Sequence, residues 1–303
     1  MEQRQLGRDG PMVSAICFGA WPLGGGMGRL AEADAIATVQ AAIDVGMTFI
    51  DTAQSYLTSE ALIGKAIAAR RSDVFLATKL SDTDQSNSAM QSALENSLRA
   101  LGTDYIDLYQ LHFPQPRWPI EETMAALVRL RDQGKIRYIG ISNFSAQQTL
   151  EALRHGPIHS SQPRYNMLER EADEAILPTC LDNGIGVIPH SVLAQGLLSG
   201  RYRSGDTFPA DDERRGYEAF TAEALARTTK PLSAMADWAR DHGRDLVQLA
   251  VAWCLAQPAV TSPIVGAKSP EQVQHNASAA DWKLDQAELA EIETMLADFL
   301  GER

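Results

Sequence analysis

Four side chains of complementary chemistry follow short apolar runs of this sequence. Asp51 ends the segment MTFID, Lys79 ends VFLATK and His112 ends YIDLYQLH, while Tyr56 lies in the polar loop after Asp51. Together they could carry out acid–base chemistry, because a lysine ammonium stabilises a phenolate and lowers the phenol pKa from about 10. A carboxylate would keep that lysine charged. A histidine would donate a hydrogen bond to a carbonyl oxygen as negative charge develops on it.

Each of these residues has an ordinary structural interpretation when it is taken alone. Asp51 could cap a turn, and the stem of Lys79 could lie on apolar surface with its ammonium in water. His112 could be a hydrogen-bonded core histidine and Tyr56 a surface tyrosine. The chemical interpretation therefore requires a fold that brings these segment ends to one place.

Near-continuously apolar runs about 30 residues apart predict strands of a parallel sheet that is buried on both faces. Between them, apolar residues recur every three or four positions, which predicts helices that end at Gly46, Gly102 and Gly134. Ser145 with Gln148 predicts a capping box. The strands predicted from this pattern are 47–51, 74–79, 105–112 and 136–142, and further strands are predicted at 160–166, 185–191, 261–266 and 281–284.

These elements predict an α/β fold, a (β/α)8 TIM barrel formed as a single domain over residues 1–303. We expect a short N-terminal β-hairpin to cap the bottom of the barrel. Polar residues at the carboxyl ends of barrel strands converge on one mouth, so the four residues above could share one site.

A doubly wound dinucleotide-binding fold is the competing architecture. The segment GMGRLA (26–31) matches a glycine fingerprint of that fold, and Asp51 follows about 20 residues later. However, WPLGG separates these glycines from the apolar run AICFGA, whereas the fingerprint follows a strand directly. We therefore interpret the segment as a glycine-rich loop that closes an N-terminal hairpin.

The composition indicates a globular protein that acts on small molecules. Of 303 residues 45% are hydrophobic and 22% charged, and the net charge of -12 disfavours nucleic acid and anionic lipid as partners. Three cysteines without CxxC spacing fit reduced, buried thiols. The first ten residues lack an apolar leader, and no apolar run is long enough to span a membrane. We expect a cytoplasmic location, and no metal site is indicated.

The sequence resembles the aldo-keto reductase family. The resemblance rests on the segments DTAQSYLTSE, ATKL, YIDLYQLHFP, GISNF, SSQPRYNMLER, LAQGLLSGRY and PIVGAKSPEQVQHN, which occur in the family's order from about Ile16 to the C-terminal helix. It implies that Tyr56 is the proton donor, that Asp51 and Lys79 tune it, and that His112 orients the carbonyl group.

The same resemblance implies NADPH bound across the barrel mouth without a Rossmann fold. Ser142, Asn143 and Gln162 would hold the carboxamide, and Lys268 would meet the 2′-phosphate near a helix N-terminus. The long charged loop 203–220 would fold over the cofactor. The implied cofactor contacts are Gly19, Ala20, Trp21, Asp51, Ser142, Asn143, Gln162, His190, Ser191, Leu193, Gln195, Leu197, Gly266, Lys268, Gln272 and Asn276.

Three residues depart from the family pattern. Leu57 stands where glycine usually follows the tyrosine, and it could add an apolar wall to the pocket. His190 replaces the tyrosine that commonly stacks on the nicotinamide, and Val192 replaces a proline. If His190 takes the stacking position, it would titrate near pH ~6.5 unless its surroundings shift its pKa. The expected substrate-binding residues are Trp21, Tyr56, Leu57, His112 and Phe113.

The predicted function is reversible, NADPH-dependent reduction of aldehydes or ketones. The alternative from another class is a cofactor-binding, redox-sensing subunit of a larger assembly with little turnover. A further alternative is an isomerase or lyase barrel that uses Lys79 as a Schiff base. The expected partner is a small carbonyl compound, and the sequence specifies neither its identity nor an oligomeric state.

Overall fold

Eight parallel strands form a closed ring in the computed structural model, which describes residues 1–81 and 83–300. Each strand pairs with the next one in chain order, and β10 pairs with β3. The ring closes where Thr261 N–H donates to the Val187 carbonyl at 2.8 Å and Ile264 N–H donates to the Pro189 carbonyl at 2.9 Å. The strands are β3 (Cys17–Gly19), β4 (Phe49–Asp51), β5 (Phe75–Leu80), β6 (Ile106–Leu111), β7 (Ile136–Ser142), β8 (Ser160–Gln162), β9 (Gly186–Val187) and β10 (Ile264–Gly266).

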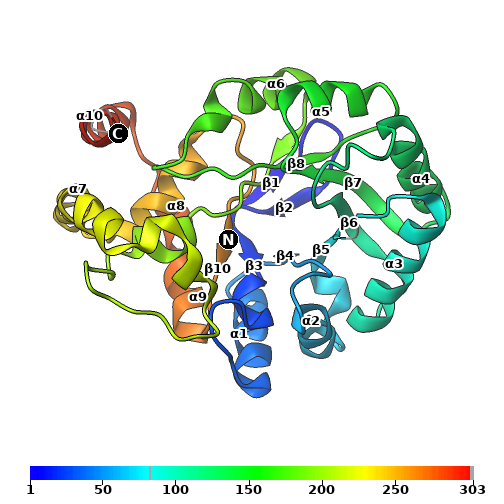
Figure 1. Ribbon diagram of the computed structural model, residues 1–303, viewed down its shortest axis with the longest axis horizontal. Helices are drawn as coiled ribbons and strands as arrows, with labels where there is room; N and C mark the ends of the chain where they lie inside the picture. Colours follow the sequence, from blue (N-terminus) through cyan, green and yellow to red (C-terminus); the bar gives the residue numbers. More distant parts are fainter. Residues whose placement is uncertain (82, 301–303) are drawn as a thin grey trace.

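Helices surround this ring (Figure 1), which confirms the predicted (β/α)8 barrel. The helix after β6 ends before Gly134, and that after β5 ends at Gly102; both glycines have positive φ. The predicted capping box of Ser145 and Gln148 is present. The helices are α1 (Glu32–Asp44), α2 (Ser59–Ile67), α3 (Asn87–Leu101), α4 (Ile120–Asp132), α5 (Ala146–Leu153), α6 (Ile176–Asn183), α7 (Ala222–Asp241), α8 (Leu246–Ala256), α9 (Pro270–Ala277) and α10 (Gln286–Leu300).

The N-terminal hairpin plugs the barrel at the amino ends of its strands. Strands β1 (Gln3–Gln5) and β2 (Met12–Ser14) pair antiparallel, and Leu6 and Val13 bury their side chains in the barrel interior. There they pack with the inward-facing side chains Cys17, Phe49, Ala77, Leu108, Ile188 and Ile264. The predicted capping hairpin is therefore confirmed. That residues 1–303 form one domain stays a prediction, and positions 82 and 301–303 lie outside the described residues.

The strand predicted at 281–284 is wrong. Residues Ser278–Asp281 form a 3-10 turn, and the ring of Trp282 stacks on Trp238 of α7 with centroids 5.9 Å apart. The eighth barrel strand is instead β3, which is only three residues long and directly follows the hairpin. It begins only two residues after β2, with no helix between them, so the apolar run AICFGA was assigned to the N-terminal hairpin and not to the barrel.

The glycine-rich segment 26–31 also lies elsewhere than predicted. It does not close the hairpin, because it follows β3 and the 3-10 helix η1 (Trp21–Gly24) at the carboxyl end of the barrel. Met27 forms an isolated β-bridge with Asp212 there. The closed ring also rules out the doubly wound alternative.

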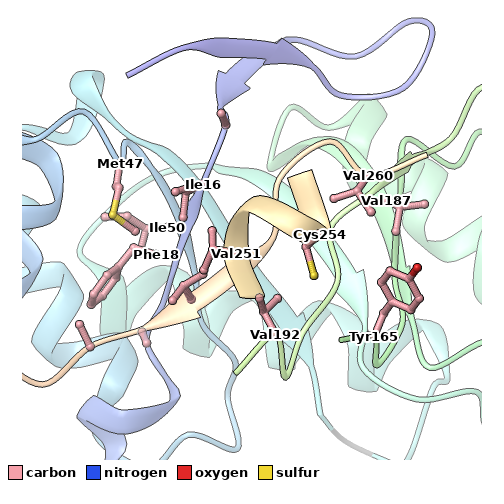
Figure 2. Packing of buried hydrophobic residues seen from close by; sticks show 14 of the residues in the cluster. Ile16, Phe18, Met47, Ile50, Tyr165, Val187, Val192, Val251, Cys254 and Val260 are labelled. Atoms are coloured by element: carbon pink, nitrogen blue, oxygen red, sulfur yellow. The ribbon is translucent and has the colours of Figure 1, made fainter. Parts of the chain in front are cut away.

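The larger hydrophobic core lies between the strands and the surrounding helices. Figure 2 shows part of it, where Ile16 and Phe18 pack near Val251 of α8, and Val187 and Val260 lie beside Cys254. All three cysteines are buried and unpaired. This layer holds the strands rigidly, so the side chains at their carboxyl ends have fixed positions.

The inward-facing positions of neighbouring strands change from apolar to polar at one level of the barrel. Alternate side chains of a strand share one face, so a residue two positions after an inward apolar residue also points inward. Lys79 pairs in register with Gln110, which places both at the same height. The inward pairs, apolar residue first, are Phe49 and Asp51, Ala77 and Lys79, and Leu108 and Gln110. The apolar layer thus supports a polar layer at the mouth.

Candidate active site

The ammonium of Lys79 is the centre of this polar layer. Its side chain is fully buried, and Nζ donates to Asp51 Oδ2 at 2.5 Å, to the Thr52 carbonyl at 3.0 Å and to the Tyr56 hydroxyl at 3.2 Å. All three N–H groups of a lysine ammonium therefore have acceptors. Burial opposes the charge, but the attraction of Asp51 and Tyr56 outweighs it and raises the pKa of Lys79. Lys79 thus has no N–H group left for a ligand.

Asp51 is fixed by two glutamines in addition to the lysine. Its Oδ1 atom accepts from Gln110 Nε2 at 2.9 Å and from Gln162 Nε2 at 3.0 Å, and Gln162 Nε2 also donates to Gln110 Oε1 at 3.1 Å. The prediction missed Gln110, which lies inside the apolar run of β6 and is fully buried. A polar side chain within an apolar run was the available signal. These bonds orient the carboxylate toward Lys79.

Tyr56 presents a protonated hydroxyl at the mouth. Its oxygen accepts a hydrogen bond from Lys79, so its own O–H hydrogen is available to a bound ligand. The ring lies edge-on to Trp21 and to His112, with centroids 4.7 Å and 5.8 Å away. Burial raises the pKa of Tyr56 above its ordinary value, although the Lys79 ammonium acts in the opposite direction. The expectation of a lowered phenol pKa is therefore wrong, because burial outweighs the effect of the lysine charge and the charge of Asp51 also raises the pKa.

His112 is a neutral imidazole beside Tyr56. Burial and the positive charge of Lys79 lower its pKa to about 3. Its Nδ1 atom lies 3.0 Å from the hydroxyl oxygen of Ser81, and its ring stacks on Phe113 with centroids 4.6 Å apart. A neutral imidazole can donate one hydrogen bond, so His112 can contribute a donor without a full charge.

One large cavity of about 740 Å³ joins these residues to the loops after β9 and β10. Most of the predicted site residues line it. They are Gly19, Ala20, Trp21, Asp51, Tyr56, His112, Phe113, Asn143, Gln162, His190, Ser191, Leu193, Gln195, Gly266, Lys268, Gln272 and Asn276. Among the described residues there is no group of three or more metal-ligating side chains, and no helix is long and apolar enough to cross a bilayer.

Three predicted contact residues do not line this cavity. The Ser142 hydroxyl is buried and donates to the Gln162 carbonyl, so it holds β7 against β8. Leu197 is buried in the outer core, because the loop turns sharply at Gln195 and Gly196, which both have positive φ. Leu57 is 77% exposed and points away from the cavity that Tyr56 lines. It therefore forms no apolar wall of the pocket.

Leu57 adopts a backbone conformation that favours glycine. Its φ is 47°, and the other non-glycine residues with positive φ in the described chain also lie in loops at the carboxyl end of the barrel, at Asn143, Ser191, Ala194 and Gln195. A left-handed conformation costs a residue with a Cβ atom about 1–2 kcal/mol, and strain of this kind gathers at functional sites.

Relief of this strain should stabilise the protein. We expect Leu57→Gly to raise the free energy of unfolding by about 0.5–1 kcal/mol in urea titrations, because little packing is lost at an exposed side chain. Leu57→Ala is the matched control, since it removes the same side chain but keeps the Cβ atom and the strain. Equal stabilities of the two variants would contradict this account.

His190 is neutral, and both of its ring nitrogens form hydrogen bonds with neighbouring side chains. Its Nε2 atom lies 3.0 Å from Asn143 Oδ1, and its Nδ1 atom lies 2.9 Å from Ser191 Oγ. Burial, together with the charges of Lys79 and Arg164, lowers its pKa to about 3. The surroundings of His190 therefore shift its pKa well below ~6.5, and the expected titration near that pH is wrong. Sequence alone could not show this burial.

The lining of the cavity includes a cationic region. Four basic side chains line it, whereas its acidic lining residue, Asp51, is already paired with Lys79. Arg214 binds Asp212 and the Tyr202 hydroxyl, and the Lys268 ammonium donates to the Met27 carbonyl. The basic lining residues are Arg164, Arg201, Arg214 and Lys268. In a chain of net charge -12, this concentration of positive charge gives the cavity a region that would attract an anion.

The loop 203–220 lies against this cationic region. Asp212 forms a β-bridge with Met27, and Glu213 N–H donates to the Gly26 carbonyl at 3.0 Å. Arg214 and Tyr217 of this loop line the cavity. The prediction named the loop but none of its residues, because contacts between distant loops leave no local pattern.

Comparisons with known proteins agree with this geometry. A model described as the Aldo/keto reductase family matches residues 15–297. The chain is 37% identical to the aldo-keto reductase YhdN of Bacillus subtilis, over 100% of this chain and 96% of that protein. It is 35% identical to a probable voltage-gated potassium channel subunit beta of Oryza sativa, over 93% and 92%.

A solved structure agrees as well. The glycerol dehydrogenase from Gluconobacter oxydans has a TM-score of 0.89 and 30% identity to this chain, with 98% of this chain and 96% of that one covered. The matches extend over the barrel and over the loops that form the cavity. With this coverage and the shared barrel, the chain belongs to the aldo/keto reductase family, the oxidoreductases that act on carbonyl groups.

Proposed function

We propose that this protein reduces aldehydes or ketones to alcohols with NADPH, and that Tyr56 is the proton donor. The observation that carries the proposal is the hydrogen bonding of the Tyr56 hydroxyl. It accepts a hydrogen bond from Lys79, whose other two N–H groups already have acceptors, and its own hydrogen remains available to a ligand in the cavity. Steady-state NADPH oxidation with a panel of aldehydes and ketones tests it. Absence of turnover with every carbonyl compound would contradict the proposal.

The chain's own residues would handle the proton and the developing charge. A bound reduced nicotinamide supplies the hydride that forms the new C–H bond at the carbonyl carbon. The Tyr56 O–H hydrogen passes to the carbonyl oxygen, and the phenolate that remains is stabilised by the Lys79 ammonium 3.2 Å away. Neutral His112 would donate to the same carbonyl oxygen as its negative charge grows. Proton and hydride together give the alcohol, and the reverse steps oxidise it.

The residues of the cationic region fit a phosphorylated dinucleotide. Lys268 and Arg214 are close enough that the charge of Arg214 contributes, after burial, to a lowered pKa of Lys268. Gln272 and Asn276 line the same end of the cavity on α9. Two neighbouring cations suit a dianion such as a 2′-phosphate, which is the group that distinguishes NADPH from NADH.

Lys268 should therefore determine the preference for NADPH. We expect Lys268→Ala to weaken NADPH binding by about 10- to 100-fold and to leave NADH binding unchanged, because a charge-assisted contact contributes about 1.5–3 kcal/mol. Calorimetric titration of both cofactors measures this. Lys135→Ala is the control, since Lys135 pairs with Glu95 just before the amino end of β7. Equal affinity of the unmodified protein for both cofactors would exclude this role.

A second prediction about the cofactor follows from the pKa of His190. With a pKa of about 3, His190 stays neutral between about pH 5.5 and 8 and would become positive only as the pH falls toward 3. The ratio of the NADP⁺ and NADPH dissociation constants should therefore be flat over that range and unchanged in His190→Tyr. A ratio that rises as the pH falls in the unmodified protein alone would contradict it.

The mouth near Tyr56 suggests the class of carbonyl compound. Trp21 and Phe113 line it beside His112, and the neighbouring polar groups are Ser55 and Asn143. This lining favours aromatic or short aliphatic aldehydes, because flat rings give apolar contact around one polar carbonyl.

A redox-sensing subunit is the second candidate function, since a relative at 35% identity is a probable potassium channel subunit. Such a subunit would bind NADPH without appreciable turnover, so the carbonyl panel separates the two functions. The Schiff-base alternative conflicts with the geometry. The buried ammonium of Lys79 has three acceptors and a raised pKa, whereas a Schiff-base lysine must be neutral to attack.

A further inference from the structure

Ser81 contacts the ring of His112 directly after β5. Its hydroxyl oxygen lies 3.0 Å from His112 Nδ1, and among the described residues no other side chain forms a hydrogen bond with that ring. Nδ1 is therefore engaged inside the protein. Nε2 is the ring nitrogen that remains for a ligand in the cavity that His112 lines.

The function proposed above requires one particular tautomer of His112. A neutral imidazole carries its hydrogen either on Nδ1 or on Nε2, and the partner of one nitrogen decides which. Only the form with hydrogen on Nε2 can donate to a carbonyl oxygen in the cavity. In that form Nδ1 has a lone pair and must accept a hydrogen bond from Ser81.

The Ser81 hydroxyl has one hydrogen and two acceptors within reach. One is His112 Nδ1 at 3.0 Å, and the other is the hydroxyl oxygen of Ser55 at 3.1 Å. The Ser55 backbone N–H donates to Ser81 Oγ at 3.3 Å, so an acceptor position of Ser81 is already used. If the hydrogen goes to His112, Nε2 is protonated. If it goes to Ser55, Nδ1 carries the hydrogen and donates to Ser81, and Nε2 cannot donate.

The position of Ser81 is itself held by neighbouring elements. Its backbone N–H donates to Gln54 Oε1 at 3.2 Å, and Gln54 Nε2 donates to the Ala93 carbonyl of α3 at 2.6 Å. The loop after β4, the end of β5 and helix α3 are thereby linked. A hydroxyl held in this way can orient a histidine without touching the substrate.

We propose that Ser81 is a positioning residue that selects the Nε2-protonated tautomer of His112 by donating its hydroxyl hydrogen to Nδ1. The choice of this tautomer rests on the proposed carbonyl reduction, because the geometry also allows Ser81 to donate to Ser55. The tautomer itself is a property of the free protein and can be measured without turnover. Ser55 competes for the same hydrogen. Loss of the Ser55 hydroxyl should therefore favour the Nε2-protonated form, whereas loss of the Ser81 hydroxyl should disfavour it.

Nitrogen NMR of the full chain labelled with ¹⁵N-histidine tests the tautomer without any turnover. The His112 signals are identified by their absence in His112→Gln. We expect protonated Nε2 and bare Nδ1 in the unmodified protein, in Ser81→Thr and in Ser55→Ala, and a shift toward protonated Nδ1 in Ser81→Ala. A protonated Nδ1 in the unmodified protein, or an unchanged pattern in Ser81→Ala, would overturn the proposal.

Kinetics test the consequence. We expect Ser81→Ala to lower kcat by about 10- to 100-fold, by analogy with metal-binding histidines that lose the group that orients them, with NADPH affinity unchanged. Ser81→Thr should restore most of this loss because it keeps the hydroxyl. A kcat of Ser81→Ala equal to that of the unmodified enzyme would overturn the role. Absence of turnover in the unmodified protein would contradict the proposed function and leave the NMR result to decide the tautomer.

Discussion

Tyr56→Phe should lower kcat for carbonyl reduction by about 10²- to 10⁴-fold, the usual contribution of a general acid. The substitution removes the hydroxyl that accepts from Lys79 and lines the cavity, but keeps the ring beside Trp21. Since burial raises the pKa of Tyr56, the unmodified residue holds its proton at neutral pH and can act as an acid. Single-turnover measurements with NADPH and an aldehyde substrate isolate the chemical step.

NADPH affinity provides the control for this variant. The phenol is proposed as a proton donor and not as a cofactor ligand, so calorimetry should show NADPH binding within a few-fold of the unmodified protein. Tyr105→Phe is a matched change, because Tyr105 lies before β6 at the opposite end of the barrel, where Arg71 and Arg137 contact its ring. If Tyr56→Phe had the same kcat as the unmodified protein, Tyr56 would not be the proton donor.

Asp51→Asn should destabilise the fold by about 3–5 kcal/mol, because it leaves the buried charge of Lys79 without its counter-ion. The two side chains are 0% and 3% exposed and lie 2.5 Å apart, so solvent screens the pair only weakly. Equilibrium unfolding in urea measures the loss. The new amide would also face the amides of Gln110 and Gln162, which now donate to the carboxylate.

A double variant separates the lost charge from the lost packing. In Asp51→Asn with Lys79→Met, no charge is left unpaired, so this protein should be more stable than Asp51→Asn alone despite carrying one more substitution. Both proteins should be inactive as reductases, since each lacks the charged pair that supports Tyr56. A double variant less stable than the single one would show that Lys79 does not depend on Asp51 for its burial.

Local pattern was sufficient to predict the parts of this protein that depend on neighbouring residues in the chain. Four apolar runs that end about 30 residues apart, together with three further segments, predicted seven of the barrel strands, because strands buried on both faces are largely apolar. Asp51, Lys79 and His112 were placed at strand ends by the same pattern, and the parallel arrangement then brings those ends to one mouth. The segments that resemble those of the aldo/keto reductase family predicted that the chain belongs to it.

Other features depend on contacts between segments far apart in the chain. Gln110 and Gln162 meet at Asp51 only because β4, β6 and β8 face one barrel interior, and neither contact has a local signal. Arg214 reaches the cavity through a loop whose position is set by Met27 and Gly26. The first barrel strand, Cys17–Gly19, was missed because it follows the hairpin strand β2 after two residues, without the helix that separates the other barrel strands.

The ionisation states and the side-chain directions of the site residues also depend on the tertiary structure. The residue types of Tyr56 and His190 set only their ordinary pKa values, whereas burial and nearby charges raise the first and lower the second to about 3. Leu57 faces solvent because its backbone turns with positive φ, a property of the loop and not of leucine. The amino-acid sequence by itself thus determined which side chains lie at the mouth of the barrel. Burial, charge and backbone direction in the folded barrel determined their ionisation states and their contacts, because these depend on the surroundings in three dimensions.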